Sequence, residues 1–218
     1  MRTVIAGGHG KVGLRLGALL AQRGDHPVGL VRAPEQAPDL AAAGVEPLVL
    51  DLVAATPQQL AEALQGADAV VFSAGAGGRG GPEATNAIDG DAAVRLVDAA
   101  SAAGVRRFVL VSVFMDAGRG GQVSDTFENY MRVKRASDVH LAASGLDWTI
   151  LRPGTLTDDP GTGTVHLGAA IGYGDVRRDD VAAVLAELLH APGTVHQVLE
   201  LTAGETPVAD AVSAVARA

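Results

Sequence analysis

The sequence contains no cysteine, and aromatic residues make up only 3% of its 218 positions. Without cysteine, disulfide bonds and thiolate chemistry are excluded. No run of about 18 apolar residues occurs, so no membrane-spanning helix is expected. The apolar stretch at the N-terminus turns to glycine too early to be the apolar region of a signal peptide. A cytoplasmic protein is therefore the default expectation.

Lysine is also scarce, with two lysines beside fifteen arginines, and the formal net charge is -8. The basic residues are scattered, which argues against a nucleic-acid-binding surface. The histidines share no ligand-like spacing, so no metal site is predicted. A length of 218 residues with 48% apolar side chains suits one domain with a sizeable core. We expect a small-molecule substrate as the partner, and a monomer or a homodimer.

Short β-branched runs alternate with segments rich in alanine and leucine. Strands are predicted at 3–7, 26–31, 45–50, 68–73, 106–112, 147–152 and 196–201, and helices at 11–23, 57–65, 88–103, 126–144, 179–191 and 207–217. Most strand runs are continuously apolar, which is typical of parallel strands buried on both faces. The alternation predicts a doubly wound, Rossmann-like α/β fold with strand order 3-2-1-4-5-6 and room for a seventh strand.

Two stretches do not fit this alternation. Residues 74–87 are glycine-rich and are predicted to be a loop, and residues 153–178 are loop-like with one short strand at 164–168. No linker separates two halves of the chain. We therefore expect residues 1–218 to form a single nucleotide-binding domain.

A glycine-rich loop follows the first predicted strand and opens the first helix. Its sequence is GGHGKVG at 7–13. Gly7 permits a tight turn, Gly10 lets the backbone approach a pyrophosphate, and Gly13 lets the helix pack closely on the strand. Lys11 adds positive charge, and His9 is placed to contact the phosphates or the nicotinamide. The candidate cofactor ligands here are Gly7, His9, Gly10, Lys11, Val12 and Gly13; the alternative is an ordinary glycine-rich turn.

The ends of the next strands supply further candidates. Arg32 lies 19 residues past Gly13, where an acidic residue would indicate NAD and an arginine indicates NADP. We therefore predict NADP over NAD, the alternative being a solvated surface arginine. Asp51, followed by Leu52, ends the third strand and could accept from the adenine amino group or serve as a turn residue. The fourth strand ends in the small residues Ser73, Ala74 and Gly75, which suit close passage beside a cofactor.

A tyrosine and a lysine lie one helical turn apart in YMRVK, residues 130–134. Tyr130 would exchange a proton with a carbonyl oxygen. The Lys134 ammonium would lower the pKa of that phenol and hold the nicotinamide ribose. Ser112, which closes the fifth strand, would donate a hydrogen bond to the oxygen that gains charge. The alternative is a solvated helix face.

The chain resembles the atypical short-chain dehydrogenase/reductases, the NAD(P)-binding proteins similar to NmrA and biliverdin reductase B. The matching pieces are GGHGKVG, Asp51-Leu52, FVLVS, YMRVK, SGLDWTILRPGTLT (144–157) and RRDDVAAVLAELL (177–189). The resemblance implies a Rossmann fold, a nicotinamide cofactor and a small substrate lobe contributed by residues 153–178. It also implies that Arg152 and Pro153 lie beside the nicotinamide.

Together these patterns predict an NADP-dependent oxidoreductase that transfers hydride to a small carbonyl, quinone-like or flavin-like acceptor. Some members of the family it resembles are redox sensors without turnover, so a non-catalytic NADP sensor of the NmrA type is the alternative. An epimerase or isomerase ranks below both, because the segment after residue 153 leaves little room for a sugar nucleotide.

Overall fold

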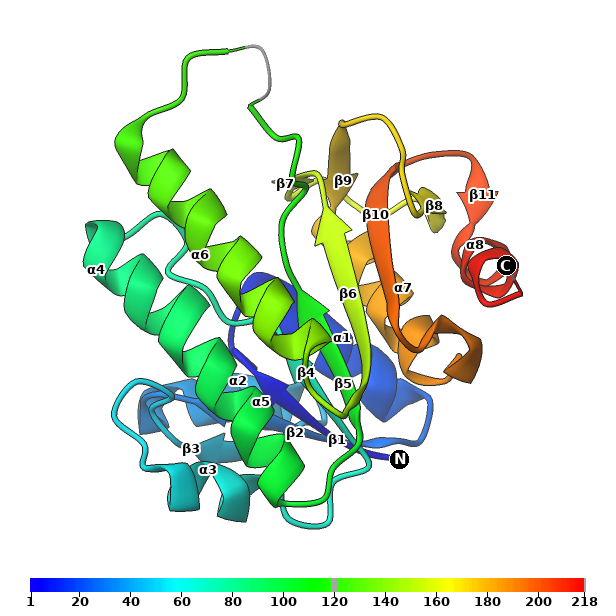
Figure 1. Cartoon of the computed structure of the whole chain (residues 1–218). Coiled ribbons are helices and arrows are strands. Elements are labelled where there is room, and N and C mark those ends of the chain that lie inside the picture. Colours follow the sequence, from blue (N-terminus) through cyan, green and yellow to red (C-terminus); the bar gives the residue numbers. More distant parts are fainter. Residues whose placement is uncertain (119–120, 218) are drawn as a thin grey trace.

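The computed structural model describes residues 1–118 and 121–217. Within these residues a nine-stranded sheet runs through the molecule, with helices on both faces (Figure 1). Its strands, from edge to edge, are β3 (Glu46–Val49), β2 (His26–Val31), β1 (Arg2–Ala6), β4 (Ala69–Phe72), β5 (Arg107–Val111), β6 (Asp147–Pro153), β10 (Gln197–Ala203), β8 (Thr164–Gly168) and β11 (Thr206–Pro207).

The sheet order confirms the prediction. The first six predicted strands occur in the order 3-2-1-4-5-6, and β10 is the seventh, parallel to β6. The two outer strands β8 and β11 add antiparallel pairing at that edge. Because β1 to β6 are parallel, their carboxyl ends, and the loops that follow them, meet at one edge of the sheet.

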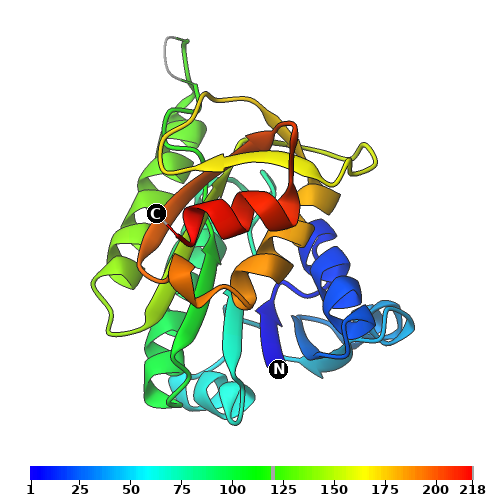
Figure 2. The same ribbon diagram turned by 90° about the vertical axis from the view of Figure 1, so that its right-hand side faces the viewer.

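The helices form two layers. They are α1 (Lys11–Gln22), α2 (Ala37–Ala42), α3 (Pro57–Leu64), α4 (Gly81–Thr85), α5 (Ala92–Ala102), α6 (Asp125–Ala142), α7 (Arg178–Leu189) and α8 (Val208–Val215). Figure 2 shows α1, α7 and α8 on one face of the sheet, whereas α5 and α6 run along the other face in Figure 1. The buried apolar side chains form two large clusters that match these layers, with Leu16 and Leu185 in one cluster and Leu60 and Leu96 in the other.

Three segments differ from the sequence-based expectation. The stretch 74–87 is not all loop, because α4 begins at Gly81, with a proline in its first turn, and leads into a π-helical turn, Asn86–Asp91. The segment 153–178 contains two further strands, β7 (Thr155–Thr157) and β9 (Asp175–Arg177), which pair with each other. The short helix α2 was not predicted at all. Segments rich in glycine and proline, and elements of only three to six residues, offer too few positions for a periodic hydrophobic pattern.

Close backbone contact between β2 and the glycine loop generates a stability prediction. A Cβ atom on Gly8 would lie 2.6 Å from the Gly29 Cα, so one backbone must move. We expect Gly8→Ala to lower the free energy of unfolding by about 1–3 kcal/mol, as overpacking does, measured by urea denaturation. Gly145→Ala is the matched control, since its Cβ would meet nothing within 4 Å. Equal stability of the two variants would contradict the packing argument.

Candidate functional site

The glycine loop is held by backbone contacts that leave no space for side chains. Gly7 has a φ of 82°, and its carbonyl oxygen accepts from the Gly10 N–H at 2.9 Å. A Cβ on Gly13 would lie 2.3 Å from that same oxygen, and a Cβ on Gly7 would lie 2.8 Å from the Cα of Ala74. The loop therefore brings the start of α1 against the ends of β1 and β4.

The start of α1 suits an anion. Within the described chain, no side chain caps this helix at Gly10, and its first turn has no acidic residue. Its first N–H groups therefore point out of the helix end unbonded by a side chain, as a bound phosphate requires. Lys11 extends from this turn and forms an ion pair with Asp158, which also accepts from Arg178 at 2.8 Å. The glycine loop and the segment 153–178 are thus tied together, and the cradle fits a dinucleotide pyrophosphate.

His9 is fixed beside the loop. Its Nε2 lies 2.7 Å from Asp39, and its Nδ1 lies 3.2 Å from the amide of Gln36. The Gln36 side-chain oxygen in turn accepts from the backbone N–H of Arg32 at 3.1 Å. The Arg32 side chain itself is exposed and makes no ion pair with any described residue. This arrangement holds the backbone at the end of β2 and leaves the guanidinium available to a ligand.

The residues at the ends of β3 and β4 make different contacts. Asp51 is exposed and uses Oδ1 to accept from the Val53 N–H at 2.8 Å, so the carboxylate supports a turn in this structure. Leu52, next to it, is half-buried. Ser73 continues the β1–β4 ladder by donating its N–H to Ala6 at 2.9 Å, and this places Ala74 and Gly75 against the glycine loop.

Ser112 and Lys134 meet at the end of β5. Ser112 is 5% exposed, and its N–H donates to the Leu151 carbonyl at 2.7 Å. Lys134 is 2% exposed, and its Nζ donates to the carbonyl of Val111 at 2.8 Å. Helix α6 thus places its lysine beside the strand end that carries the serine, as the sequence predicted for these two residues.

Tyr130 behaves differently from the expectation. Its ring lies 6.3 Å from that of Phe127, centroid to centroid, on the first turns of α6. Burial raises the pKa of its phenol, and the negative charges of Asp89 and Asp138 raise that pKa further. The prediction that Lys134 lowers the phenol pKa is therefore wrong for this structure. The phenol stays protonated at neutral pH.

Asp89 and Asp138 are the functional candidates that the sequence reasoning missed. Asp138 is 3% exposed, and its Oδ2 accepts from the Arg152 guanidinium at 2.9 and 3.1 Å. Asp89 is 4% exposed and accepts from the Ala76 N–H at 2.9 Å. Asp138 lies four residues after Lys134, so helical spacing was a usable signal. Asp89 belongs to the unpredicted π-helical turn, and no sequence signal marked it.

Ser112 and Asp138 lie close together at the end of β5. The Ser112 Oγ and the Asp138 Oδ1 are both enclosed, and neither has a hydrogen-bond partner within the described part of the chain. Burial raises the pKa of Asp138, whereas the nearby Ser112 hydroxyl and Arg152 guanidinium lower that pKa. The Ser112 hydroxyl thus lies near the carboxylate without a hydrogen bond to it.

Arg152 and Pro153 lie at the end of β6. Arg152 is half-buried and committed to Asp138, while Pro153 is buried and pairs in register with Leu201 of β10. The structure places both at the same sheet edge as Ser112.

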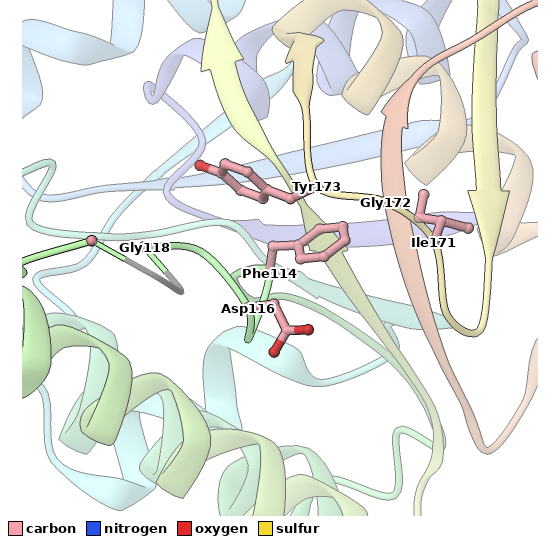
Figure 3. Close-up of a pocket in the computed structure, with 7 residues that line it drawn as sticks. Phe114, Asp116, Gly118, Ile171, Gly172 and Tyr173 are labelled. Atoms are coloured by element: carbon pink, nitrogen blue, oxygen red, sulfur yellow. The ribbon is translucent and has the colours of Figure 1, made fainter.

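A cavity of about 520 Å³ opens at this edge (Figure 3). Phe114 and Tyr173 meet across it edge to face, with ring centroids 5.3 Å apart, and the Tyr173 hydroxyl lies 2.6 Å from that of Thr155. The cavity is lined by Phe114, Asp116, Gly118, Gly121, Ile171, Gly172 and Tyr173. It is therefore built from the segment after β5 and the loop before β9, which suits a substrate next to a cofactor.

No group of three or more histidine, aspartate or glutamate side chains among the described residues is arranged to hold a metal ion. None of the helices within residues 1–118 and 121–217 is long and apolar enough to cross a membrane.

Comparison with known proteins points to nucleotide binding. A Bacillus subtilis protein named "Uncharacterized sugar epimerase YhfK" is 37% identical over 97% of this chain and 99% of its own length. A Bacillus halodurans structure named "Putative NAD-dependent epimerase/dehydratase" matches with a TM-score of 0.91 and 34% identity over 98% of this chain and 99% of that chain. ChuY, an anaerobillin reductase from Escherichia coli O157:H7, matches with a TM-score of 0.78 and 28% identity over 94% and 98%.

A family model described as NAD(P)H-binding matches residues 7–192, which begin at the glycine loop and extend past α7. The match includes the carboxyl ends of β2 to β6. With its Rossmann-like sheet and glycine loop, the chain belongs to this NAD(P)H-binding family.

Proposed function

We propose that the protein is an NADP-dependent oxidoreductase that transfers hydride to a small carbonyl, quinone-like or flavin-like acceptor. The observation that carries the proposal is the position of the uncapped start of α1, which shares one sheet edge with Ser112 and Lys134. The cavity at that edge supplies a place for the acceptor. The name of ChuY, a reductase, supports turnover over sensing.

Arg32 supports NADP. An exposed arginine at the end of β2 suits a ribose 2′-phosphate, whereas an NAD site favours an acid there. The nearest acid, Glu35, lies three residues further along, in the short 3-10 turn Pro34–Gln36 that precedes α2.

The chain's own residues have separate tasks. Bound nicotinamide supplies the hydride. Tyr130, kept protonated by burial and by nearby carboxylates, donates a proton to the acceptor oxygen during reduction. Ser112 donates a hydrogen bond to that oxygen as it gains charge. Lys134 places a positive charge at the end of β5, next to Ser112. The raised phenol pKa keeps Tyr130 in the protonated form from which it donates, although it also makes the phenol a weaker acid.

A second candidate is suggested by the name of the Bacillus subtilis relative. An epimerase would retain its nucleotide through a cycle of oxidation and reduction. The segment 153–178 adds only the short strands β7, β8 and β9, which leaves little room for a sugar nucleotide. We therefore rank this function below reduction, and the non-catalytic sensor becomes an outcome of the first experiment below.

Replacement of the phenol tests turnover. We expect Tyr130→Phe to lower kcat by about 10²–10⁴-fold, the usual contribution of a general acid, while the affinity for NADPH changes less than about twofold. Tyr173→Phe is the matched control; it keeps a ring in the cavity and should act on KM. The assay follows NADPH oxidation over a panel of quinones, flavins and small carbonyls. Unchanged kcat in Tyr130→Phe would remove the tyrosine from the mechanism, and no turnover with any acceptor would favour the sensor.

Replacement of Arg32 tests the cofactor preference. We expect Arg32→Ala to weaken NADPH binding at least about tenfold, which corresponds to about 1.4 kcal/mol, and to leave NADH binding unchanged. Arg106→Ala is the control, because Arg106 is exposed, pairs with Asp147 and lies at the opposite end of β5. An equal loss of affinity for NADPH and NADH would show that Arg32 does not recognise the 2′-phosphate.

A further inference from the structure

Charged side chains from three elements are enclosed around the end of β5. Asp89 comes from the π-helical turn, Lys134 and Asp138 from α6, and Arg152 from β6. Their exposed fractions are 4%, 2% and 3% for the first three, and Arg152 is half-buried. The proposed mechanism gives the two carboxylates an effect on Tyr130 and leaves open what they do for Lys134.

The hydrogen bonds of this cluster reach three different strand ends. Lys134 Nζ donates to the Val111 carbonyl of β5 at 2.8 Å. Asp89 accepts the N–H of Ala76, after β4, at 2.9 Å, and its own carbonyl accepts from the Ser137 hydroxyl at 2.9 Å. Asp138 accepts from Arg152 on β6. The cluster therefore joins the ends of β4, β5 and β6 to helix α6.

The enclosed ammonium needs these carboxylates. Burial lowers the pKa of Lys134, and the negative charges of Asp89 and Asp138 act in the opposite direction. Burial likewise raises the pKa of Asp89, and the positive charge of Lys134 is the largest of the effects that lower it. With all four groups ionised, two positive and two negative charges balance. An ammonium bonded only to a neutral carbonyl in such a place would tend to lose its proton.

We propose that Asp89 and Asp138 are positioning residues that keep the enclosed Lys134 ammonium charged and fixed on the Val111 carbonyl. The same two charges act on Tyr130, where they favour the protonated phenol. One carboxylate pair thus sets both partners for reduction, a charged lysine and a neutral tyrosine. This consequence rests on the proposed function, whereas the charge state of Lys134 is a property of the chain alone.

The charge state is directly measurable because the chain has only two lysines, Lys11 and Lys134. Protein labelled with ¹³C at the lysine Cε gives two NMR signals, which Lys11→Arg assigns. Without any cofactor, we expect the Lys134 signal of the wild type to be that of a charged ammonium at pH 7. This measurement needs no variant in the cluster, so a neutral Lys134 would overturn the proposal even where a variant fails to fold.

Variants then identify the carboxylates responsible. Asp89→Asn keeps an oxygen for the Ala76 N–H and removes the charge; Asp138→Asn does the same opposite Arg152. Removing a negative charge favours the neutral amine, so each variant should lower the midpoint of the Lys134 titration by about one pH unit or more. Asp180→Asn is the matched control. Asp180, on α7, is 2% exposed and accepts from the N–H groups of Thr162 and Gly163 in the loop before β8, so the midpoint should not move.

A neutral Lys134 at pH 7 in the wild type would overturn the proposal. So would a midpoint that stays the same in both cluster variants, or one that moves equally in Asp180→Asn. In Asp89→Asn and Asp138→Asn, the basic limb of the pH profile of kcat/KM should move to lower pH together with the NMR midpoint. A protein that fails to bind NADPH would refute the proposed function, and the lysine titration would still decide this inference.

Discussion

Close backbone packing at the start of α1 is the constraint on which the rest of the site depends. Gly13 brings the helix against the Gly7 carbonyl, and Gly7 itself lies against the backbone of Ala74. Any side chain at these positions would push the helix away from β1 and β4. With them as glycine, the uncapped N–H groups of α1 face the sheet edge where β5 and β6 also end. The same contact therefore brings together the start of α1, where we propose that the cofactor phosphates bind, and the strand ends where we propose that the acceptor is reduced.

Electrostatics at the other side of that edge follow from burial. Helix α6 encloses Lys134 together with Asp138, and the π-helical turn brings in Asp89. A single enclosed charge would be costly, but carboxylates and cations together satisfy one another. Arg152 extends the balance to β6. In the arrangement that we propose, the enclosed Lys134 remains charged and the half-buried Tyr130 remains protonated.

Much of this could be predicted from the sequence, and the reasons for the remainder are physical. The glycine loop and the strand order were predictable because continuous apolar strands and fixed glycine positions leave little choice of topology. The convergence of Ser112 and Lys134 followed from that topology. The position of the Asp89 side chain was not predictable, because the π-helical turn Asn86–Asp91 breaks the regular periodicity expected of the predicted helix 88–103. The direction of the Tyr130 pKa was wrong for the same reason, since it depends on buried carboxylates that were not recognised. The strands β7 and β9 are three residues each, too short for a pattern.

A titration of the purified wild type with NADPH and with NADH shows whether the glycine loop binds a phosphorylated nicotinamide dinucleotide. Nicotinamide fluorescence reports the binding. We expect micromolar affinity for NADPH and affinity at least about tenfold weaker for NADH, a difference of about 1.4 kcal/mol. Equal affinity would contradict the assignment of Arg32. Absence of binding by either dinucleotide would contradict the whole account of the site.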